Sequence, residues 1–286
     1  MVGDMTYENL GEGALDYLPC RYGKSKLLFR GPRRKLEGEY ALFLGGTETY
    51  GKFIEQPFPA LVERQLGLPC VNFGWLNAGV DVFLNDSTVV EAAQAARVTV
   101  IQVMGAQNMS NRFYAVHPRR NDRFLKASTL MKQVFREVDF TEFHFTRHML
   151  STLSRLSPER YAMVVDELRA AWLARMEQLL AKVSGKTVLL WLADHSPDDA
   201  RPEDGLGADP LFVDREMIER IRPLVTEVVE VSASPKALAL GTDGMVFSQM
   251  EAPAASEMLG PLVHAEAAAL LTDPLGNLLG KSRRSA

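Results

Sequence analysis

The feature that most constrains the fold is an apolar run that ends abruptly in turn-forming residues, Leu42-Phe43-Leu44-Gly45-Gly46-Thr47-Glu48-Thr49-Tyr50-Gly51. Such a run predicts a buried strand over residues 40–44 that ends in a tight loop, with a helix beginning near Pro57 to Pro59. Ligands bind at the carboxyl ends of central strands in parallel α/β sheets. We therefore expect the Thr47 hydroxyl at a ligand site; an ordinary strand-to-helix turn is the alternative.

Four more apolar runs predict strands over residues 70–73, 98–104, 186–193 and 227–231. Between and after them we expect helices over residues 88–96, with Asp86 and Ser87 as cap candidates, 217–222 and 256–271. Strands that alternate with helices indicate an α/β fold with a doubly wound parallel sheet of five strands. The 286 residues, 47% of them apolar, are enough for one large domain, and we expect a single domain over residues 1–286.

The chain between the third and fourth predicted strands is much longer than a single crossover requires. We expect helices there over residues 125–137, 142–156 and 159–182, the last with Ser157 as cap, Pro158 at its first position and Gly185 as its stop. We interpret residues 109–185 as a helical insertion that forms a lid or cap. A helix that packs at an interface is the alternative.

Composition excludes several functional classes. A net charge of −4 and a pI near 5.8 do not indicate a nucleic-acid or membrane-surface binder. The two cysteines, Cys20 and Cys70, indicate a reducing compartment. The first eight residues lack the cations of a signal peptide, and no apolar run approaches the roughly 18 residues of a membrane helix. We therefore expect a cytoplasmic protein without a cofactor, and we find no metal-binding cysteine cluster.

Basic residues gather in two places. Residues 1–39 hold seven cations within a fifteen-residue stretch, which predicts a solvated basic arm, with an anion clamp as the alternative. The second cluster, Arg112, Arg119, Arg120 and Arg123, begins four residues after Asn108 at the end of the third strand. This position predicts that these arginines bind phosphate, sulfate or carboxylate groups of a substrate at the mouth of the pocket.

Four short blocks resemble those of the SGNH (GDSL-like) hydrolase superfamily: Gly45-Gly46-Thr47-Glu48-Thr49-Tyr50-Gly51, Val71-Asn72-Phe73-Gly74, Gly105-Ala106-Gln107-Asn108 and Pro261-Leu262-Val263-His264. The resemblance implies a flavodoxin-like sheet, Thr47 in the place of the nucleophilic serine, Gly74 with Gln107 or Asn108 as oxyanion donors, and His264 as base. The family's two aspartates are replaced by Gly46 and Pro261. The acid that would support His264 is Glu257, Glu266 or Asp243.

The leading functional hypothesis is an esterase or acyltransferase that acts on an anionic or carbohydrate small molecule. A non-catalytic binding protein on the same fold is one alternative, and a sulfuryl- or phosphoryl-transfer enzyme that uses the basic clusters is another. Two other pairs compete for the site. Asp194 and His195 follow the fourth strand directly, and His144 and His148 have metal-ligand spacing on a predicted helix.

Overall fold

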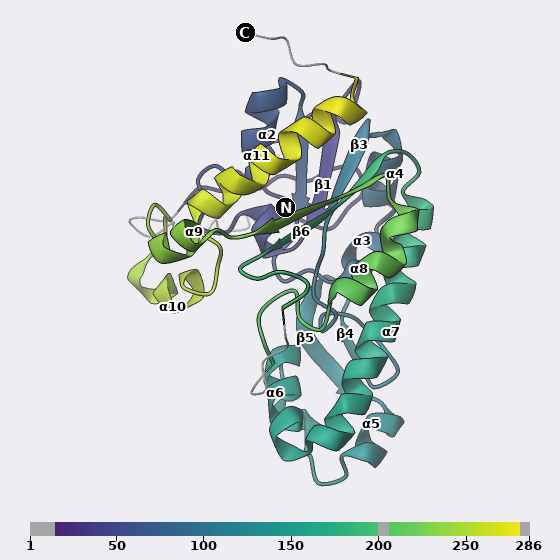
Figure 1. Ribbon diagram of the computed structural model, residues 1–286. Helices are drawn as coiled ribbons and strands as arrows, with labels where there is room; N and C mark the ends of the chain where they lie inside the picture. The colour runs from purple at the N-terminus through teal and green to yellow at the C-terminus, as the bar shows by residue number, and fades with distance from the viewer. Residues whose placement is uncertain (1–14, 200–205, 281–286) are drawn as a thin grey trace, which may run out of the picture.

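A computed structural model describes residues 15–199 and 206–280, and its centre is a five-stranded sheet of order β2-β1-β3-β6-β7 (Figure 1). The strands are β1 (Ala41–Gly45), β2 (Cys70–Gly74), β3 (Val98–Gln102), β6 (Thr187–Ala193) and β7 (Glu227–Ser232). All four neighbouring pairs are parallel, which confirms the doubly wound, flavodoxin-like sheet. The strand order reverses between β1 and β3, and ligands bind at such switch points.

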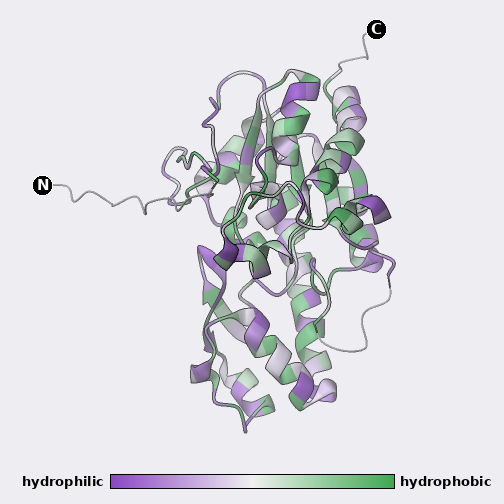
Figure 2. Ribbon diagram, turned by 90° about the vertical axis from the view of Figure 1, so that its left-hand side faces the viewer, coloured by the Kyte–Doolittle hydropathy of each residue, from purple (hydrophilic) through white to green (hydrophobic). Residues whose placement is uncertain are grey.

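Helices cover both faces of the sheet (Figure 1). One face carries α2 (Phe58–Leu66), α9 (Pro235–Leu240) and α11 (Pro261–Leu278), and the other carries α3 (Val80–Leu84), α4 (Ser87–Ala95), α7 (Pro158–Lys182) and α8 (Arg215–Ile221). Leu42 and Leu44 of β1 face one core, while Phe43 faces the other. Because both faces are buried, β1 and β6 are almost wholly apolar, and the strands of the sheet are mainly green (hydrophobic) in Figure 2.

Two predicted caps fix where helices begin. The Asp86 carboxylate accepts hydrogen bonds from the backbone N–H groups of Thr88 and Val89, at 3.0 and 3.2 Å, so α4 starts at Ser87. The Ser157 hydroxyl accepts from the backbone N–H of Arg160 at 3.4 Å, and α7 starts at Pro158 as predicted. The helix ends at Lys182, three residues before Gly185, which adopts a φ of +113°.

The segment between β3 and β6 is not wholly helical. β4 (Tyr114–His117) and β5 (Arg120–Ala127) form an antiparallel hairpin, followed by α5 (Thr129–Val134), the 3₁₀ turn η1 (Phe140–Glu142), α6 (Thr146–Leu156) and α7. The helix predicted over 125–137 is therefore wrong at both ends: the Ser128 side chain caps the start of α5 by accepting from the N–H of Met131, and α5 already ends at Val134. The Trp172 indole of α7 donates to the Met104 carbonyl at 2.7 Å, so this part of α7 is an interface helix on the sheet.

The chain after β6 follows the prediction less closely. Three short elements join α8, β7, α9 and α11. They are the 3₁₀ turns η2 (Arg222–Leu224) and η3 (Gln249–Glu251) and the helix α10 (Ala252–Ala255). The last helix, α11, begins at Pro261, which is five residues after the predicted start at residue 256. The basic tail over 281–286 lies outside the described residues. No helix among the described residues has the length and apolar character needed to cross a membrane.

Residues 15–39 pack against the domain through apolar side chains and Arg30, whereas five cations of the expected solvated arm are exposed: Arg21, Lys24, Lys26, Arg33 and Lys35. Leu27 and Phe29 are buried, and the ring of Phe29 stacks on Phe73 with centroids 4.2 Å apart. The Arg30 side chain is buried as well, and its guanidinium donates to the backbone carbonyls of Tyr50, Gly51, Ile54 and Glu55. This charge therefore anchors the chain that follows the β1 loop. Residues 1–14 of the predicted arm lie outside the described residues.

Candidate functional site

One buried amide holds the loop at the end of β1. The Gln102 Oε1 atom accepts hydrogen bonds from the N–H of Gly46 (3.1 Å), the N–H of Thr49 (3.1 Å) and the hydroxyl of Thr49 (2.6 Å). These bonds satisfy N–H groups at the start of the short helix α1 (Thr47–Tyr50), which have no partner within the helix. Residue 45 must be glycine, because a Cβ there would lie 2.1 Å from Thr49 Oγ1. The position of Thr47 is thus set jointly by β1 and β3.

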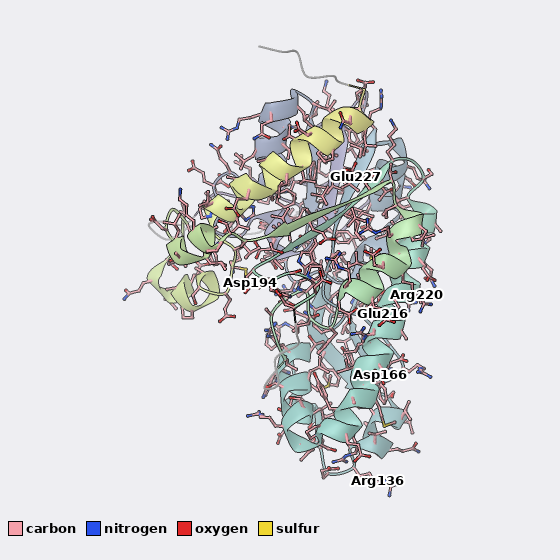
Figure 3. All side chains as sticks on the ribbon, viewed as in Figure 1. Arg136, Asp166, Asp194, Glu216, Arg220 and Glu227 are labelled. Atoms are coloured by element: carbon pink, nitrogen blue, oxygen red, sulfur yellow. The ribbon has the colours of Figure 1, made fainter. Side chains whose placement is uncertain are left out.

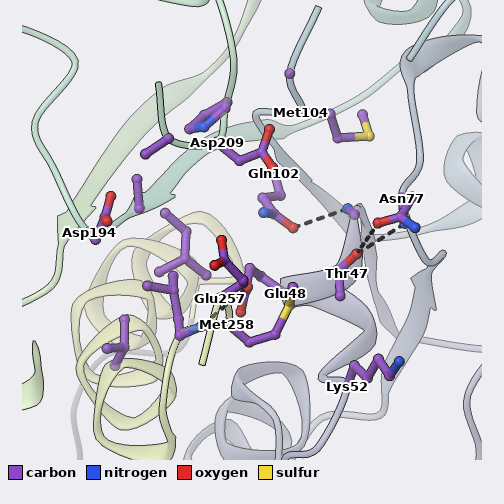
Figure 4. A pocket seen from close by; sticks show the side chains of 18 of the residues that line it. Thr47, Glu48, Lys52, Asn77, Gln102, Met104, Asp194, Asp209, Glu257 and Met258 are labelled. Carbon is purple, nitrogen blue, oxygen red and sulfur yellow. Dashed lines mark hydrogen bonds between the residues drawn. The ribbon is translucent and has the colours of Figure 1, made fainter. Parts of the chain in front are cut away.

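A cavity of about 650 Å³ opens at the carboxyl ends of β1, β3 and β6, beside the switch point (Figure 4). Its polar lining consists of hydroxyl, amide, carboxylate and cationic side chains from the end of β3, from α1 and α6, and from loops that include the one before α11. These are Thr47, Glu48, Lys52, Asn77, Gln102, Gln107, Asn108, Arg147, Asp194, Asp209, Ser256 and Glu257. Leu76, Met104 and Met258 add apolar surface. The cavity therefore offers hydrogen-bonding groups beside apolar surface, as small-molecule sites do.

The Thr47 hydroxyl contacts a residue that the sequence did not single out. The backbone N–H of Asn77 donates to Thr47 Oγ1 at 3.0 Å, and the Asn77 side-chain oxygen lies 3.4 Å from the same atom (Figure 4). Asn77 adopts a φ of +51°, a left-handed conformation that asparagine tolerates better than most residues. No hydrogen bond among the described residues joins Thr47 to an imidazole.

Gln107 and Asn108 line the cavity, as expected, and each already uses one side-chain N–H. Gln107 Nε2 donates to Asp209 Oδ1 at 2.9 Å, and Asn108 Nδ2 donates to the Asn77 carbonyl at 3.1 Å. Asn108 Oδ1 also accepts from the Thr146 hydroxyl of α6 at 2.8 Å. Both amides therefore hold the cavity wall together. Each keeps a second N–H, so the oxyanion-donor role stays a prediction.

Gly74 and His264 do not belong to the cavity lining. The Gly74 N–H donates to Asn72 Oδ1 at 2.8 Å, and a Cβ at residue 74 would lie 2.1 Å from the backbone nitrogen of Tyr50. The glycine thus allows α1 to pack closely on β2.

His264 is fully buried, and its Nδ1 accepts the N–H of Phe58 at 3.2 Å. This bond caps the start of α2, and His264 is not among the residues that line the cavity with Thr47, Gln107 and Asn108. Whether His264 acts as a base stays a prediction.

The four arginines predicted at the pocket mouth are not in the cavity lining. Arg112 pairs with the buried Glu167 of α7, with its Nε 2.6 Å from Glu167 Oε2. Arg119 and Arg120 lie exposed at the turn of the β4–β5 hairpin, and the Arg123 guanidinium lies over the Phe145 ring at 4.3 Å. The hairpin, which the sequence did not reveal, accounts for this difference. Anion binding by these residues stays a prediction.

Acids outnumber cations in the cavity. Its carboxylates are Glu48, Asp194, Asp209 and Glu257, whereas Lys52 and Arg147 are its only cations among the described residues. Arg147 Nη1 lies 3.2 Å from Asp209 Oδ2, so one cation is already paired. Counted by formal charge, four carboxylates and two cations give the lining a net charge of two negative units.

Asp194 lines the cavity at the end of β6, where Figure 3 labels it, but its neighbour His195 does not. His195 Nδ1 lies 2.6 Å from Asp194 Oδ1. The hydrogen bond to this carboxylate raises the pKa of His195, and the same bond lowers the pKa of Asp194.

His144 and His148, the pair with metal-ligand spacing, are both exposed. The described residues contain no group of three or more side chains that could together bind a metal ion.

Comparison with known proteins identifies the family. The model of the family called "Domain of unknown function (DUF6473)" matches residues 5–279. The chain belongs to this family. A search of curated proteins found no match.

Two solved structures are similar to this chain at low sequence identity. A gut microbial diltiazem-metabolizing enzyme is 14% identical with a TM-score of 0.42, over 84% of this chain and 47% of that one. A lipase from a goat rumen metagenome is 12% identical with a TM-score of 0.35, over 82% of this chain and 98% of that one. This chain thus spans about half the length of the first of them. At these TM-scores neither likeness supports an inference about activity.

Several cavity residues had no role in the sequence-based prediction. Glu48 lies three residues after the end of β1, and Asn77 lies three residues after the end of β2. Their places after strand ends could therefore have predicted that both residues line the cavity. Arg147 lies on α6, and Asp209 lies in the loop after β6. Nothing in the sequence pattern connects these two residues to the switch point.

Proposed function

We propose that the cavity binds a neutral, hydroxyl-rich small molecule of the carbohydrate class. The observation that supports this proposal is the excess of carboxylates over cations in the lining. Carboxylate oxygens accept hydrogen bonds from sugar hydroxyls, and the amide of Asn108 both donates and accepts. Leu76, Met104 and Met258 offer apolar surface for the C–H faces of a sugar ring.

The same lining disfavours an anionic ligand. A phosphate group brings roughly −1.5 to −2 charges at neutral pH. Two like unit charges about 4 Å apart repel by roughly 4 kcal/mol at an effective dielectric constant of about 20. Because Arg147 is paired with Asp209, Lys52 is left to offset this repulsion. Of the two predicted substrate classes we therefore favour carbohydrates, and we do not favour sulfuryl or phosphoryl transfer.

The test compares each neutral hexose of a small panel (glucose, galactose, mannose) with its own 6-phosphate, by saturation-transfer NMR and titration at low ionic strength. We expect each neutral sugar to bind at least about tenfold more tightly than its 6-phosphate. A repulsion of roughly 1.4 kcal/mol is enough to change the Kd tenfold. Glu159→Gln, which removes one exposed charge on α7, is the control and should leave this ratio unchanged. Tighter binding of the phosphates would contradict the proposal.

A second candidate function is ester hydrolysis or acyl transfer with Thr47 as nucleophile, on the SGNH-like fold that the sequence blocks resemble. The observation in its favour is the Thr47 hydroxyl at the cavity, with the Asn77 N–H 3.0 Å from its oxygen, a donor that would stabilise a developing alkoxide. Because His264 is outside the lining, this candidate needs a cavity carboxylate as its general base.

A further inference from the structure

His264 is a buried titratable group with a defined proton position. Its ring is fully buried at the start of α11 and stacks on Phe58, with ring centroids 5.9 Å apart. Nδ1 accepts the N–H of Phe58 at 3.2 Å, so Nδ1 carries no proton. The hydrogen-bond network therefore assigns the proton of the neutral ring to Nε2.

The protonated nitrogen faces a cavity carboxylate. His264 Nε2 lies 3.5 Å from Glu48 Oε2 and has no hydrogen-bond partner among the described residues. The other carboxylate oxygen, Glu48 Oε1, accepts from the backbone N–H of Leu259 at 3.4 Å. Glu48 itself lines the cavity, with 17% of its side chain exposed. The carboxylate thus has a buried imidazole on one side and the ligand cavity on another.

Glu48 differs from Asp209 and Asp194, which already have partners, and from Glu257, which is exposed. Asp209 accepts from Gln107 and pairs with Arg147, and Asp194 is bonded to His195. Both contacts to Glu48 are long and come from donors that carry no formal charge, so the carboxylate is oriented without being neutralised. An ionised carboxylate has about four lone-pair sites. Glu48 therefore keeps acceptor capacity for a ligand hydroxyl.

We propose that His264 is a positioning residue for Glu48, and that Glu48 is the carboxylate that determines ligand specificity by accepting a hydrogen bond from a sugar hydroxyl. The 3.5 Å contact of Nε2 and the hydrogen bond of the Leu259 N–H engage the two carboxylate oxygens and together favour one rotamer of a flexible side chain, which lowers the conformational entropy lost on binding. The role of Glu48 toward a sugar depends on the proposed function, whereas its placement by His264 does not.

The placement is tested without any ligand, by ¹⁵N NMR of the histidine rings in the full-length protein. His264→Gln assigns the signal. We expect the Nε2–H tautomer in the wild type, and we expect Glu48→Gln to shift the Nε2 resonance. Glu55→Gln, which removes an exposed carboxylate before α2, is the control and should not shift it. A proton on Nδ1, or an Nε2 resonance unchanged by Glu48→Gln, would overturn the placement.

The specificity role is tested by titration with glucose, galactose and mannose. We expect Glu48→Gln and His264→Leu each to weaken the tightest of the three sugars by about tenfold, the usual size for losing a hydrogen bond to a charged group. His264→Gln should restore most of the affinity, because its amide N–H reaches the position of Nε2. Unchanged affinity in Glu48→Gln would overturn the specificity role and leave the proposed function intact. If none of the sugars binds the wild type, the proposed function and the specificity role both fail, and the NMR result alone decides the placement.

Discussion

The side-chain oxygen of Gln102 on β3 accepts both the backbone N–H and the hydroxyl of Thr49 on α1, at 3.1 and 2.6 Å. A polar side chain in a strand that is buried on both faces needs such partners, and here they lie on the loop that carries Thr47. One amide thus joins two strand ends at the switch point and fixes the floor of the cavity.

Replacing Gln102 should therefore destabilise the fold. Gln102→Leu leaves the N–H groups of Gly46 and Thr49 buried without an acceptor, and each such group costs roughly 1–3 kcal/mol. We expect the free energy of unfolding, measured in urea, to fall by about 2–6 kcal/mol. Gln133→Leu, at an exposed position of α5, is the control and should change it by less than about 0.5 kcal/mol. A loss as small as the control's would show that the loop does not depend on this amide.

Arg30 should not be replaceable by lysine. Its guanidinium reaches four backbone carbonyls, whereas an ammonium is a compact point charge without the planar fork. We expect Arg30→Lys to lower the free energy of unfolding by about 2–4 kcal/mol, and to speed proteolysis within residues 15–39. Arg21→Lys, at an exposed position, is the matched control. Equal stability of the two variants would mean that the segment is held by its apolar residues alone.

The Asp194–His195 pair predicts a pH window. The pKa of His195 is raised from 6.5, so its stabilising contribution is complete below that pH and is lost as pH rises through the folded-state pKa. The pKa of Asp194 is lowered from 3.8, so its contribution is complete above that pH and is lost as pH falls. The Tm difference between wild type and His195→Gln should therefore be largest between about pH 4 and 6.5 and shrink at alkaline pH. A pH-independent difference would contradict this coupling.

Thr47 distinguishes the two candidate functions. Because His264 is held by Phe58 and Glu48, we expect turnover of p-nitrophenyl acetate to be equal in wild type, Thr47→Ser and Thr47→Ala. Mass spectrometry should then find no acyl group on residue 47. Retained turnover in Thr47→Ser combined with loss in Thr47→Ala would favour the esterase or acyltransferase instead.

The sequence predicted the sheet because each core strand is an apolar run between turn-forming residues. It missed β5, because charged residues from Arg120 to Lys126 hide a strand whose pairing with β4 is a tertiary contact. Thr47 was singled out by its place at a strand end, and Gln107 and Asn108 by the SGNH-like block that they end; all three line the cavity. The orientation of His264 was not predictable, because it depends on the N–H of Phe58, 206 residues away along the chain.

The central claim is that the cavity at the ends of β1, β3 and β6 is a carbohydrate site. The most direct test is chemical-shift mapping of the protein with the tightest neutral sugar. We predict the largest shifts at the amides of Gly46, Thr47 and Asn77, with no change at Asn85 and Asn121 in the separate groove beside α3. Shifts confined to that groove or to the β4–β5 hairpin, with the cavity amides unmoved, would contradict the claim.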